Sequence, residues 1–266
     1  MNALTNKLRD FLYTLYLEKI LFDGNGLYSK VKVTKTGNRL NLYTGNHFLQ
    51  TYYKTNYEPQ GNFFDWYLIL PWCTGNFNGS IESLLILGLG GGSQVKLFNQ
   101  LYRVNHITGV EIDPLIIKLG KQYFDLNESN LTTLEQDAYL LFDTSSQKYS
   151  FIIIDNFKEN VFEGNCQSKS FLEKAKNHLE LEGALLLNKL KDDVTNINTL
   201  ESLTSIFTTV IEIKLKYNVF FIATNSHLAP KNTFELQKIL LDAHRSNSSL
   251  SFFKILKSQD ICVHCK

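Results

Sequence analysis

The spacing of hydrophobic positions along the second half of the chain predicts alternating strands and helices. Short unbroken apolar runs, typical of buried strands, are separated by segments whose apolar residues recur every three or four positions, as on one helix face. The predicted strands are 84–87, 107–112, 131–134, 151–154 and 184–187, and the predicted helices are 94–101, 114–124 and 168–179. Such an alternation is typical of a mostly parallel sheet covered on both faces.

The pattern changes after the fifth of these strands. Residues 210–215 and 219–223 are predicted to be two strands joined by a turn at Tyr217 and Asn218, and therefore an antiparallel pair. A helix is predicted at 233–244. The whole pattern predicts an α/β protein with the class I methyltransferase (Rossmann-like) fold. Its mostly parallel seven-stranded sheet would end in the antiparallel hairpin, which excludes the all-parallel dinucleotide-binding sheet.

A smaller N-terminal unit is predicted at 1–78, ahead of a nucleoside-binding catalytic domain at 79–266. Apolar residues at three- and four-residue steps predict an amphipathic helix that ends near 23–26. An antiparallel β-unit follows, with predicted strands at 28–34 and 40–42. The aromatic-rich segment 63–72 is expected to form a helix that Pro71 helps to terminate.

The charge balance excludes several classes of partner. Lys and Arg number 27 against 26 Asp and Glu, so the formal net charge is +1, whereas nucleic-acid binding needs a concentrated basic surface. No apolar run approaches the roughly 18 residues that a membrane helix requires. The N-terminal segment carries charges and lacks a cleavage signal. We therefore expect a cytoplasmic protein that binds neither nucleic acid nor membrane.

Of four cysteines, only Cys262 and Cys265 have the spacing of metal ligands. One such pair is half of a zinc site, and no second pair completes it. His264, which lies inside the spacer, is poorly placed to add a third ligand. The pair is interpreted as part of a frayed, reduced tail, and no metal is expected.

Candidate chemistry begins at the glycine-rich turn Gly88–Ser93, which follows a predicted strand and opens a predicted helix. Glycine lets the backbone approach a ligand closely, and the first helix amides are free to bind a polar or anionic group. Glu111 ends the next strand, where an acid can accept hydrogen bonds from both ribose hydroxyls. The combination predicts nucleoside binding; the alternative for Glu111 is an N-cap or a surface acid.

Two further positions favour an adenosylmethionine-type nucleoside over a dinucleotide. Asp137 follows the third predicted strand, where adenosylmethionine-binding folds place an acid against the adenine amino group, although it could instead cap a helix. Ser93 stands where a dinucleotide fingerprint has its third glycine.

The segments ILGLGGGS, 109–114, 136–138, 152–157 and 171–188 together resemble the spermidine synthase-like group of class I S-adenosylmethionine-dependent transferases. YSKVKV and RLNLYTGN resemble the β-hairpin domain that precedes the catalytic fold in that group. The resemblance covers about residues 27–225. The group includes aminopropyltransferases that make polyamines and relatives that methylate protein amines.

This resemblance implies S-adenosylmethionine, or decarboxylated S-adenosylmethionine, as the donor, and no metal. The donor-binding residues would be Gly88, Gly90, Gly92, Glu111, Asp137 and Ala138. Asp155, at the end of the fourth strand, would be catalytic, because a carboxylate there can take the proton of an attacking amine and orient it. The alternative for Asp155 is a cap of the following turn.

Two positions depart from the aminopropyltransferase pattern. Gly91 replaces the acid of a GGGDG turn, and Lys158 replaces a second acid three residues after the catalytic one. Both changes weaken the attraction for a cationic amine. Methyl transfer to an amine is therefore favoured over aminopropyl transfer. Two alternatives stay open, a true polyamine aminopropyltransferase and a degenerate protein that binds a nucleoside or a partner without catalysis.

The acceptor is expected to be a small-molecule or protein amine bound beneath the N-terminal unit. Its candidate binding residues are Gln50, Asp65 and Lys158. The resemblance also suggests a homodimer. Part of the interface would be the apolar face of the N-terminal helix, formed by Leu4, Leu8, Phe11 and Leu15.

Overall fold

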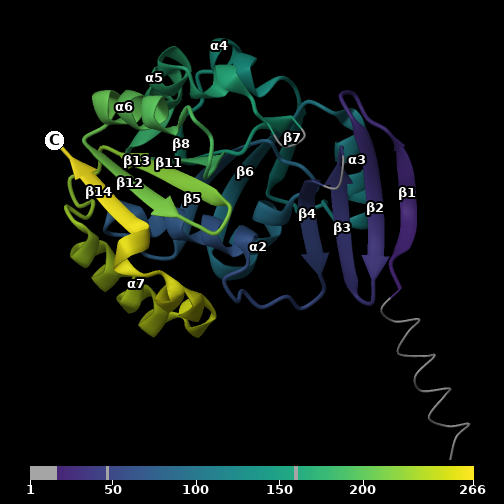
Figure 1. The fold of residues 1–266 in the computed structure, drawn as a ribbon, viewed down its shortest axis with the longest axis horizontal. Helices are drawn as coiled ribbons and strands as arrows, with labels where there is room; N and C mark the ends of the chain where they lie inside the picture. Colours follow the sequence, from purple (N-terminus) through teal and green to yellow (C-terminus); the bar gives the residue numbers. More distant parts are fainter. Residues whose placement is uncertain (1–16, 46–47, 159–160) are drawn as a thin grey trace, which may run out of the picture.

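The computed structural model describes residues 17–45, 48–158 and 161–266. A small antiparallel sheet lies beside a large mixed sheet that carries helices on both faces (Figure 1). The small sheet has the order β1-β2-β3-β4. Its strands are β1 (Lys19–Asn25), β2 (Lys30–Thr36), β3 (Arg39–Thr44) and β4 (Phe48–Lys54).

The large sheet has eight strands in the order β14-β12-β13-β11-β8-β5-β6-β7. They are β5 (Ser80–Leu87), β6 (Arg103–Glu111), β7 (Leu131–Glu135), β8 (Tyr149–Ile154), β11 (Leu179–Leu190), β12 (Thr209–Lys214), β13 (Asn218–Thr224) and β14 (Ile261–Cys265). Strands β7, β6, β5, β8 and β11 are parallel, and β13, β12 and β14 continue the sheet antiparallel. The predicted parallel core with its antiparallel hairpin is confirmed, and β14 adds an eighth strand.

The α-helices are α2 (Ser93–Leu101), α3 (Pro114–Tyr123), α4 (Leu141–Thr144), α5 (Lys169–Asn177), α6 (Asn196–Ile206) and α7 (Thr233–Ser246). The 3₁₀ segments are η1 (Phe63–Thr74), η2 (Ala138–Leu140), η3 (Gly164–Gln167), η4 (Ser248–Ile255) and η5 (Ser258–Asp260). A two-stranded ribbon consists of β9 (Phe157–Lys158) and β10 (Val161–Phe162). Within the described ranges, no helix is long and apolar enough to cross a membrane.

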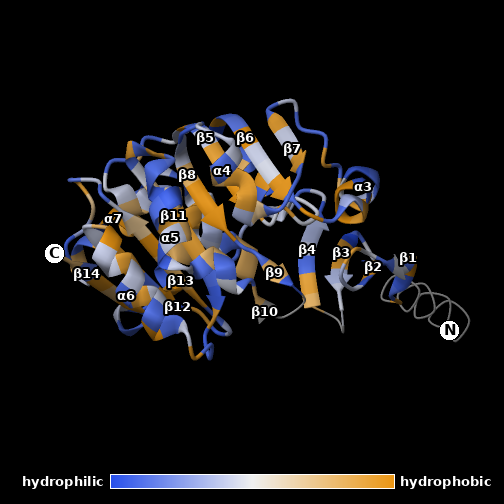
Figure 2. Ribbon diagram, turned by 90° about the horizontal axis from the view of Figure 1, so that it is seen from above, coloured by the Kyte–Doolittle hydropathy of each residue, from blue (hydrophilic) through white to orange (hydrophobic). Residues whose placement is uncertain are grey.

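Side-chain alternation along β5 explains why the large sheet is buried on both faces. Leu84 and Ile86 pack into one core cluster, which also contains side chains of η1, α2 and α7. Leu85 and Leu87 point the opposite way and join a cluster with α4, α5 and α6. Because both faces are covered, a central strand needs apolar residues at every position. Strand β8 accordingly is almost wholly hydrophobic (Figure 2).

The N-terminal unit differs from its prediction. The sequence pattern predicts a helix that reaches 23–26, whereas Lys19–Asn25 form β1, whose backbone pairs antiparallel with β2. The residues of the predicted helix face lie before residue 17, outside the described part of the chain. Strand β4 is missing from the prediction because its mixture of aromatic and polar residues does not alternate cleanly. Pro71 lies inside η1 rather than at its end, and Gly75 at φ +91° follows the last residue.

The C-terminal segment is ordered where the sequence predicts a frayed tail. Segment η4 follows α7, and β14 then pairs with β12 from Ile261 to Cys265. Helix α6 is also absent from the prediction. Tail residues gain their order from tertiary pairing, because β14 completes an otherwise open edge of the large sheet.

Candidate functional site

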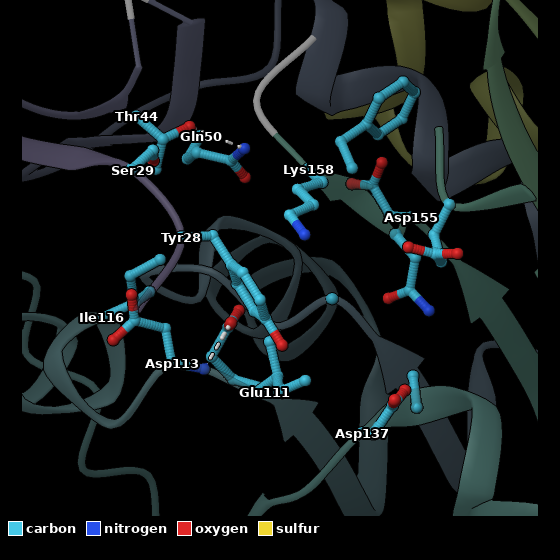
Figure 3. A pocket seen from close by; sticks show the side chains of 16 residues that line it. Tyr28, Ser29, Thr44, Gln50, Glu111, Asp113, Ile116, Asp137, Asp155 and Lys158 are labelled. Carbon is cyan, nitrogen blue, oxygen red and sulfur yellow. Dashed lines mark hydrogen bonds between the residues drawn. The ribbon is translucent and has the colours of Figure 1, made fainter. Parts of the chain in front are cut away.

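A pocket lies where the carboxyl ends of β5, β6, β7 and β8 face the turn between β1 and β2 (Figure 3). Loops at this edge of a doubly wound sheet converge, so residues distant in sequence meet there. The lining residues are Tyr28, Ser29, Thr44, Gln50, Gly88, Glu111, Ile112, Asp113, Ile116, Asp137, Ala138, Asp155, Asn156, Phe157, Lys158 and Glu163.

The glycine-rich turn allows two backbone segments to pass in close contact. Gly88 has φ +89°, and a Cβ added there would lie 2.3 Å from the carbonyl oxygen of Asp155. Only glycine fits this position without strain. Of the three glycines predicted to line a donor, Gly88 lines the pocket, whereas Gly90 and Gly92 do not.

The amides of residues 88–92 are already bonded within the protein. Gly90 donates to Glu111 Oε2 at 2.9 Å, and Gly91 donates to Thr51 Oγ1 at 2.7 Å. The other three amides of the turn donate to backbone carbonyl oxygens. Residues 88–92 therefore offer no free N–H group to a ligand, and the first helix amides, which were the expected donors, begin at Ser93. The turn contributes shape and the positioning of the acid that it holds.

Glu111 ends β6 and is buried. Its Oε2 accepts from the Gly90 amide, and its Oε1 accepts from the Asp113 amide at 3.1 Å. Burial raises the pKa of this carboxyl, and the backbone amides of Asp113, Gly90 and Ile112 oppose the shift. Each oxygen keeps a second acceptor position. The carboxylate can therefore hold the turn and still accept hydrogen bonds from two ligand hydroxyls.

Asp113 fastens the small sheet over the pocket. Its Oδ1 caps α3 through the Leu115 amide at 2.9 Å, and its Oδ2 accepts from the Leu27 amide at 2.7 Å. The second bond places the neighbouring Tyr28 and Ser29 at the pocket. Tyr28, Ser29 and Asp113 are not among the residues predicted for the site, although an Asp before Pro at the start of a helix is a recognisable capping signal.

Asp137 lies on the opposite side of the pocket from the small sheet (Figure 3), and the neighbouring Ala138 also lines the pocket. Asp137 is exposed and caps η2, because its Oδ1 accepts from the Tyr139 amide at 2.9 Å. The alternative role of Asp137 as a helix cap is therefore present. It leaves Oδ2 available to a ligand, so the two roles are compatible.

Asp155 follows β8 and is held by two side-chain amides. Asn188 donates to its Oδ1 at 2.7 Å, and Gln94 donates to its Oδ2 at 2.8 Å. Burial raises the pKa of Asp155, and these donors together with the Tyr67 hydroxyl moderate the shift. A carboxylate with a raised pKa is a stronger base than an ordinary aspartate. Sequence reasoning missed the two amides, although Asn188 is the first polar residue after the apolar run 184–187.

Lys158 lines the pocket from β9, and its ammonium lies 4.0 Å from the centre of the Tyr28 ring. A cation over an aromatic face at this distance is attracted electrostatically. Lysine and tyrosine come from segments 130 residues apart in the chain. Together they join the β9–β10 ribbon to the small sheet across the pocket (Figure 3).

The structure gives a steric reason for Gly91. A Cβ at this position would lie 2.9 Å from the Thr51 side chain, whose hydroxyl accepts from the Gly91 amide. The acid of a GGGDG turn would therefore displace Thr51 and with it part of β4. In this chain, residue 91 packs closely against Thr51 and has no charged side chain.

The two remaining acceptor candidates have different locations. Gln50 lines the pocket, where its Nε2 donates to Thr44 Oγ1 at 3.1 Å. Asp65 lies outside the pocket and is fully buried. Its Oδ2 accepts from the Tyr57 hydroxyl and from three backbone amides, each at 2.9 Å, at the start of η1. Asp65 thus caps the start of η1, and its position gives its predicted acceptor-binding role no support.

Charge along the pocket wall is strongly asymmetric. The lining acids are Glu111, Asp113, Asp137, Asp155 and Glu163, and the one lysine among the lining residues is Lys158. Such a surface attracts cations. It offers an acceptor for sugar hydroxyls, a desolvated base and an acidic wall, which suit the reaction of an amine with a positively charged nucleoside.

Sequence comparison finds relatives named as polyamine aminopropyltransferases and, at 24–25% identity over 149 residues, two Drosophila homologues of an eEF1A lysine and N-terminal methyltransferase. The family model described as "Spermine/spermidine synthase domain" matches residues 71–230. A probable polyamine aminopropyl transferase of Bifidobacterium longum is 28% identical over 190 residues, 70% of this chain and 41% of that relative. A polyamine aminopropyltransferase of Vibrio vulnificus is 34% identical over 116 residues, 42% of this chain and 39% of that relative. The matches span about two-fifths of the length of these relatives.

Two solved structures share the fold. A probable spermidine synthase from Corynebacterium glutamicum has a TM-score of 0.68 at 17% identity and covers 84% of this chain and 88% of its own. Human methyltransferase-like protein 13 has a TM-score of 0.56 at 21% identity and covers 71% of this chain and 89% of its own. At these identities the likeness establishes the class I methyltransferase fold.

Proposed function

Since the chain belongs to the spermine/spermidine synthase family, we propose that it transfers an aminopropyl group from decarboxylated S-adenosylmethionine to an amine. The names of both curated relatives favour aminopropyl transfer over the methyl transfer that Gly91 and Lys158 suggested. The acceptor class is a small polyamine precursor with two cationic ends.

The acidic pocket supports this choice of donor and acceptor. Decarboxylated S-adenosylmethionine carries a sulfonium and an ammonium and has no carboxylate, so its net charge suits a wall with five acids. Lys158 opposes binding less than its charge alone suggests, because its ammonium is already engaged by the Tyr28 ring.

The nucleoside half of the donor would bind at the ends of β6 and β7. Glu111 would accept from the ribose hydroxyls through the acceptor positions that Gly90 and Asp113 leave open. Asp137 Oδ2 would accept from the adenine amino group beside Ala138. Gly88 would allow the sulfonium to lie close to the backbone.

The observation that carries the proposal is the desolvated Asp155 carboxylate, fixed by Gln94 and Asn188 at the pocket. It would take a proton from the acceptor ammonium and orient the resulting amine. The amine nitrogen then attacks the aminopropyl methylene carbon that is bonded to sulfur. The bond between that carbon and sulfur breaks, and its electron pair stays on sulfur. The products are the extended polyamine, neutral 5′-methylthioadenosine and a proton on Asp155.

Methyl transfer from S-adenosylmethionine is the second candidate, and the position of Lys158 favours it. A lysine at the pocket could pair with the carboxylate that S-adenosylmethionine keeps and its decarboxylated form lacks. The same amine chemistry at Asp155 would then act on the methyl carbon, and the product nucleoside would be S-adenosylhomocysteine.

The by-product distinguishes these reactions. We would incubate the purified chain with each donor and with putrescine, and identify the nucleoside formed by mass spectrometry, with Asp155→Asn as the matched inactive control. We expect 5′-methylthioadenosine from the decarboxylated donor. S-adenosylhomocysteine alone would favour methyl transfer, and no Asp155-dependent product from either donor would favour a binding protein without catalysis.

A further inference from the structure

Strand β14 brings three metal-binding side chains together at the far edge of the large sheet. These are Glu212 on β12 with Cys262 and His264 on β14, and their ligand atoms all lie within 4.8 Å of one another. The cluster is separated from β8, which ends at the proposed active site, by the width of several strands. It is therefore distinct from the pocket.

The strand register explains the convergence. Glu212 and Cys262 are direct cross-strand partners. His264 lies two residues after Cys262 and therefore on the same face of β14. Cys265 is three residues from Cys262 and points to the other face, where its sulfur lies 3.8 Å from Thr209 Oγ1. The i, i+2 pair of Cys262 and His264 thus replaces the C-x-x-C pair that the sequence spacing suggested.

One potential metal-binding atom of the cluster has no hydrogen-bond partner among the described residues. The Nε2 atom of His264 is buried and has no hydrogen-bond partner in the described part of the chain. It lies 3.8 Å from Glu212 Oε2, beyond hydrogen-bond reach. Two ligands of one tetrahedral zinc ion, each about 2.0–2.1 Å from the metal, are separated by roughly 3.4 Å. The observed gap is close to that separation.

The surrounding charges suit a divalent cation. The Glu212 carboxylate and a Cys262 thiolate together supply two negative charges. The other oxygen of Glu212 lies 3.5 Å from the Lys214 ammonium. This contact orients the carboxylate, as groups bonded to a metal ligand commonly do. Cys262 is exposed and His264 is partly exposed, so an ion can enter from solvent.

We propose that Glu212, Cys262 and His264 bind a zinc-class divalent cation, with solvent as the fourth ligand. Mixed thiolate, imidazole and carboxylate ligands are those that zinc accepts. The ion would fasten the edge strand β14 to β12. Ion binding releases the proton of the Cys262 thiol to solvent, so affinity increases with pH.

Cobalt(II) is a suitable probe, because thiolate ligation gives it an absorption band that oxygen and nitrogen ligands do not. We would titrate the full chain, kept reduced with a phosphine, with Co²⁺ and then displace Co²⁺ with Zn²⁺. We expect one ion per chain and a thiolate-to-cobalt band. Cys262→Ser should abolish the band, and His264→Ala should weaken Zn²⁺ binding by about 10- to 100-fold or more.

Cys265→Ser is the matched control, because it removes a thiol from the same strand but from the opposite face. It should leave the band and the affinity unchanged. Loss of the band in Cys265→Ser, or Zn²⁺ affinity equal in wild type and Cys262→Ser, would overturn the proposal. If the variants misfold, wild-type protein still decides the matter, since a saturable Co²⁺ complex without a thiolate band excludes Cys262 as a ligand.

Discussion

Replacing Glu111 with glutamine tests the nucleoside site sharply, because the substitution keeps the shape of the side chain and changes its bonding. Both carboxylate oxygens accept from backbone amides, Oε2 from Gly90 and Oε1 from Asp113. A glutamine side chain has only one acceptor oxygen and presents an NH₂ group at the other position. One of the two amide bonds is therefore lost in either orientation, and the ribose hydroxyl on that side loses its acceptor.

The expected loss of affinity follows from this count. A hydrogen bond to a charged group contributes about 1.5–3 kcal/mol. The burial that raises the pKa of Glu111 is present without ligand, so its relief in the variant affects the stability of the fold rather than the nucleoside affinity. We expect nucleoside affinity to fall by about 1–3 kcal/mol, roughly 5- to 150-fold in the dissociation constant.

Calorimetry with two nucleosides separates ribose recognition from the ordering of the turn. We would compare 5′-methylthioadenosine with its 2′,3′-dideoxy analogue on wild type, Glu111→Gln and Glu135→Gln. Glu135 is the exposed cross-strand neighbour of Glu111 on β7 and serves as the matched control. Wild type and Glu135→Gln should prefer the hydroxylated ligand strongly, and Glu111→Gln should lose most of that preference.

Two outcomes would refute the reasoning. Equal losses for both nucleosides in Glu111→Gln would show that the residue acts only through the turn. An unchanged affinity for 5′-methylthioadenosine would remove Glu111 from the site altogether.

Asp155→Asn should lower turnover by about 10²–10⁴-fold while nucleoside affinity changes little. Because burial raises the pKa of Asp155, the wild-type rate should begin to fall at a higher pH than it would with an ordinary aspartate as base. A turnover rate that is unchanged in Asp155→Asn would contradict the role of Asp155 as base. Lys158→Asp should tighten putrescine binding in the presence of 5′-methylthioadenosine, most at low salt; no change would show that Lys158 does not oppose the acceptor. Gly88→Ala should cost more stability in urea unfolding than Gly79→Ala, since both have φ +89° but only Gly88 meets a backbone oxygen at 2.3 Å; equal costs would rule out that contact. The predicted homodimer should show twice the chain mass by light scattering at micromolar concentration, and a monomeric mass would exclude it.

The sequence by itself determined the central part of the fold. Buried strands such as 151–154 must be apolar at every position, because both faces of the sheet are covered, and this produces a local pattern that can be read directly. The glycine turn and the acids at strand ends could also be located, since a doubly wound sheet brings the carboxyl ends of its parallel strands to one edge. Glu111, Asp137 and Asp155 accordingly line one pocket.

Tertiary structure alone decided how those groups are bonded. The family resemblance placed Asp65 among the acceptor candidates, but its Oδ2 accepts from amides of the loop before η1 and the residue does not line the pocket. The amides of residues 88–92 likewise bond to Glu111, to Thr51 of β4 and to backbone oxygens. These partners are distant in sequence, so no local sequence pattern predicts the bonds.

The C-terminal strand and the contact between Lys158 and Tyr28 could not be predicted from local sequence for the same reason. A segment such as 261–265 is too short to predict as a strand, and its order comes from hydrogen bonds to β12, some fifty residues earlier. The pairing of Lys158 with Tyr28 likewise requires the β9–β10 ribbon and the small sheet to meet. Local pattern determines which residues become strands and helices, whereas edge pairing and side-chain partners depend on contacts that exist only after the chain has folded.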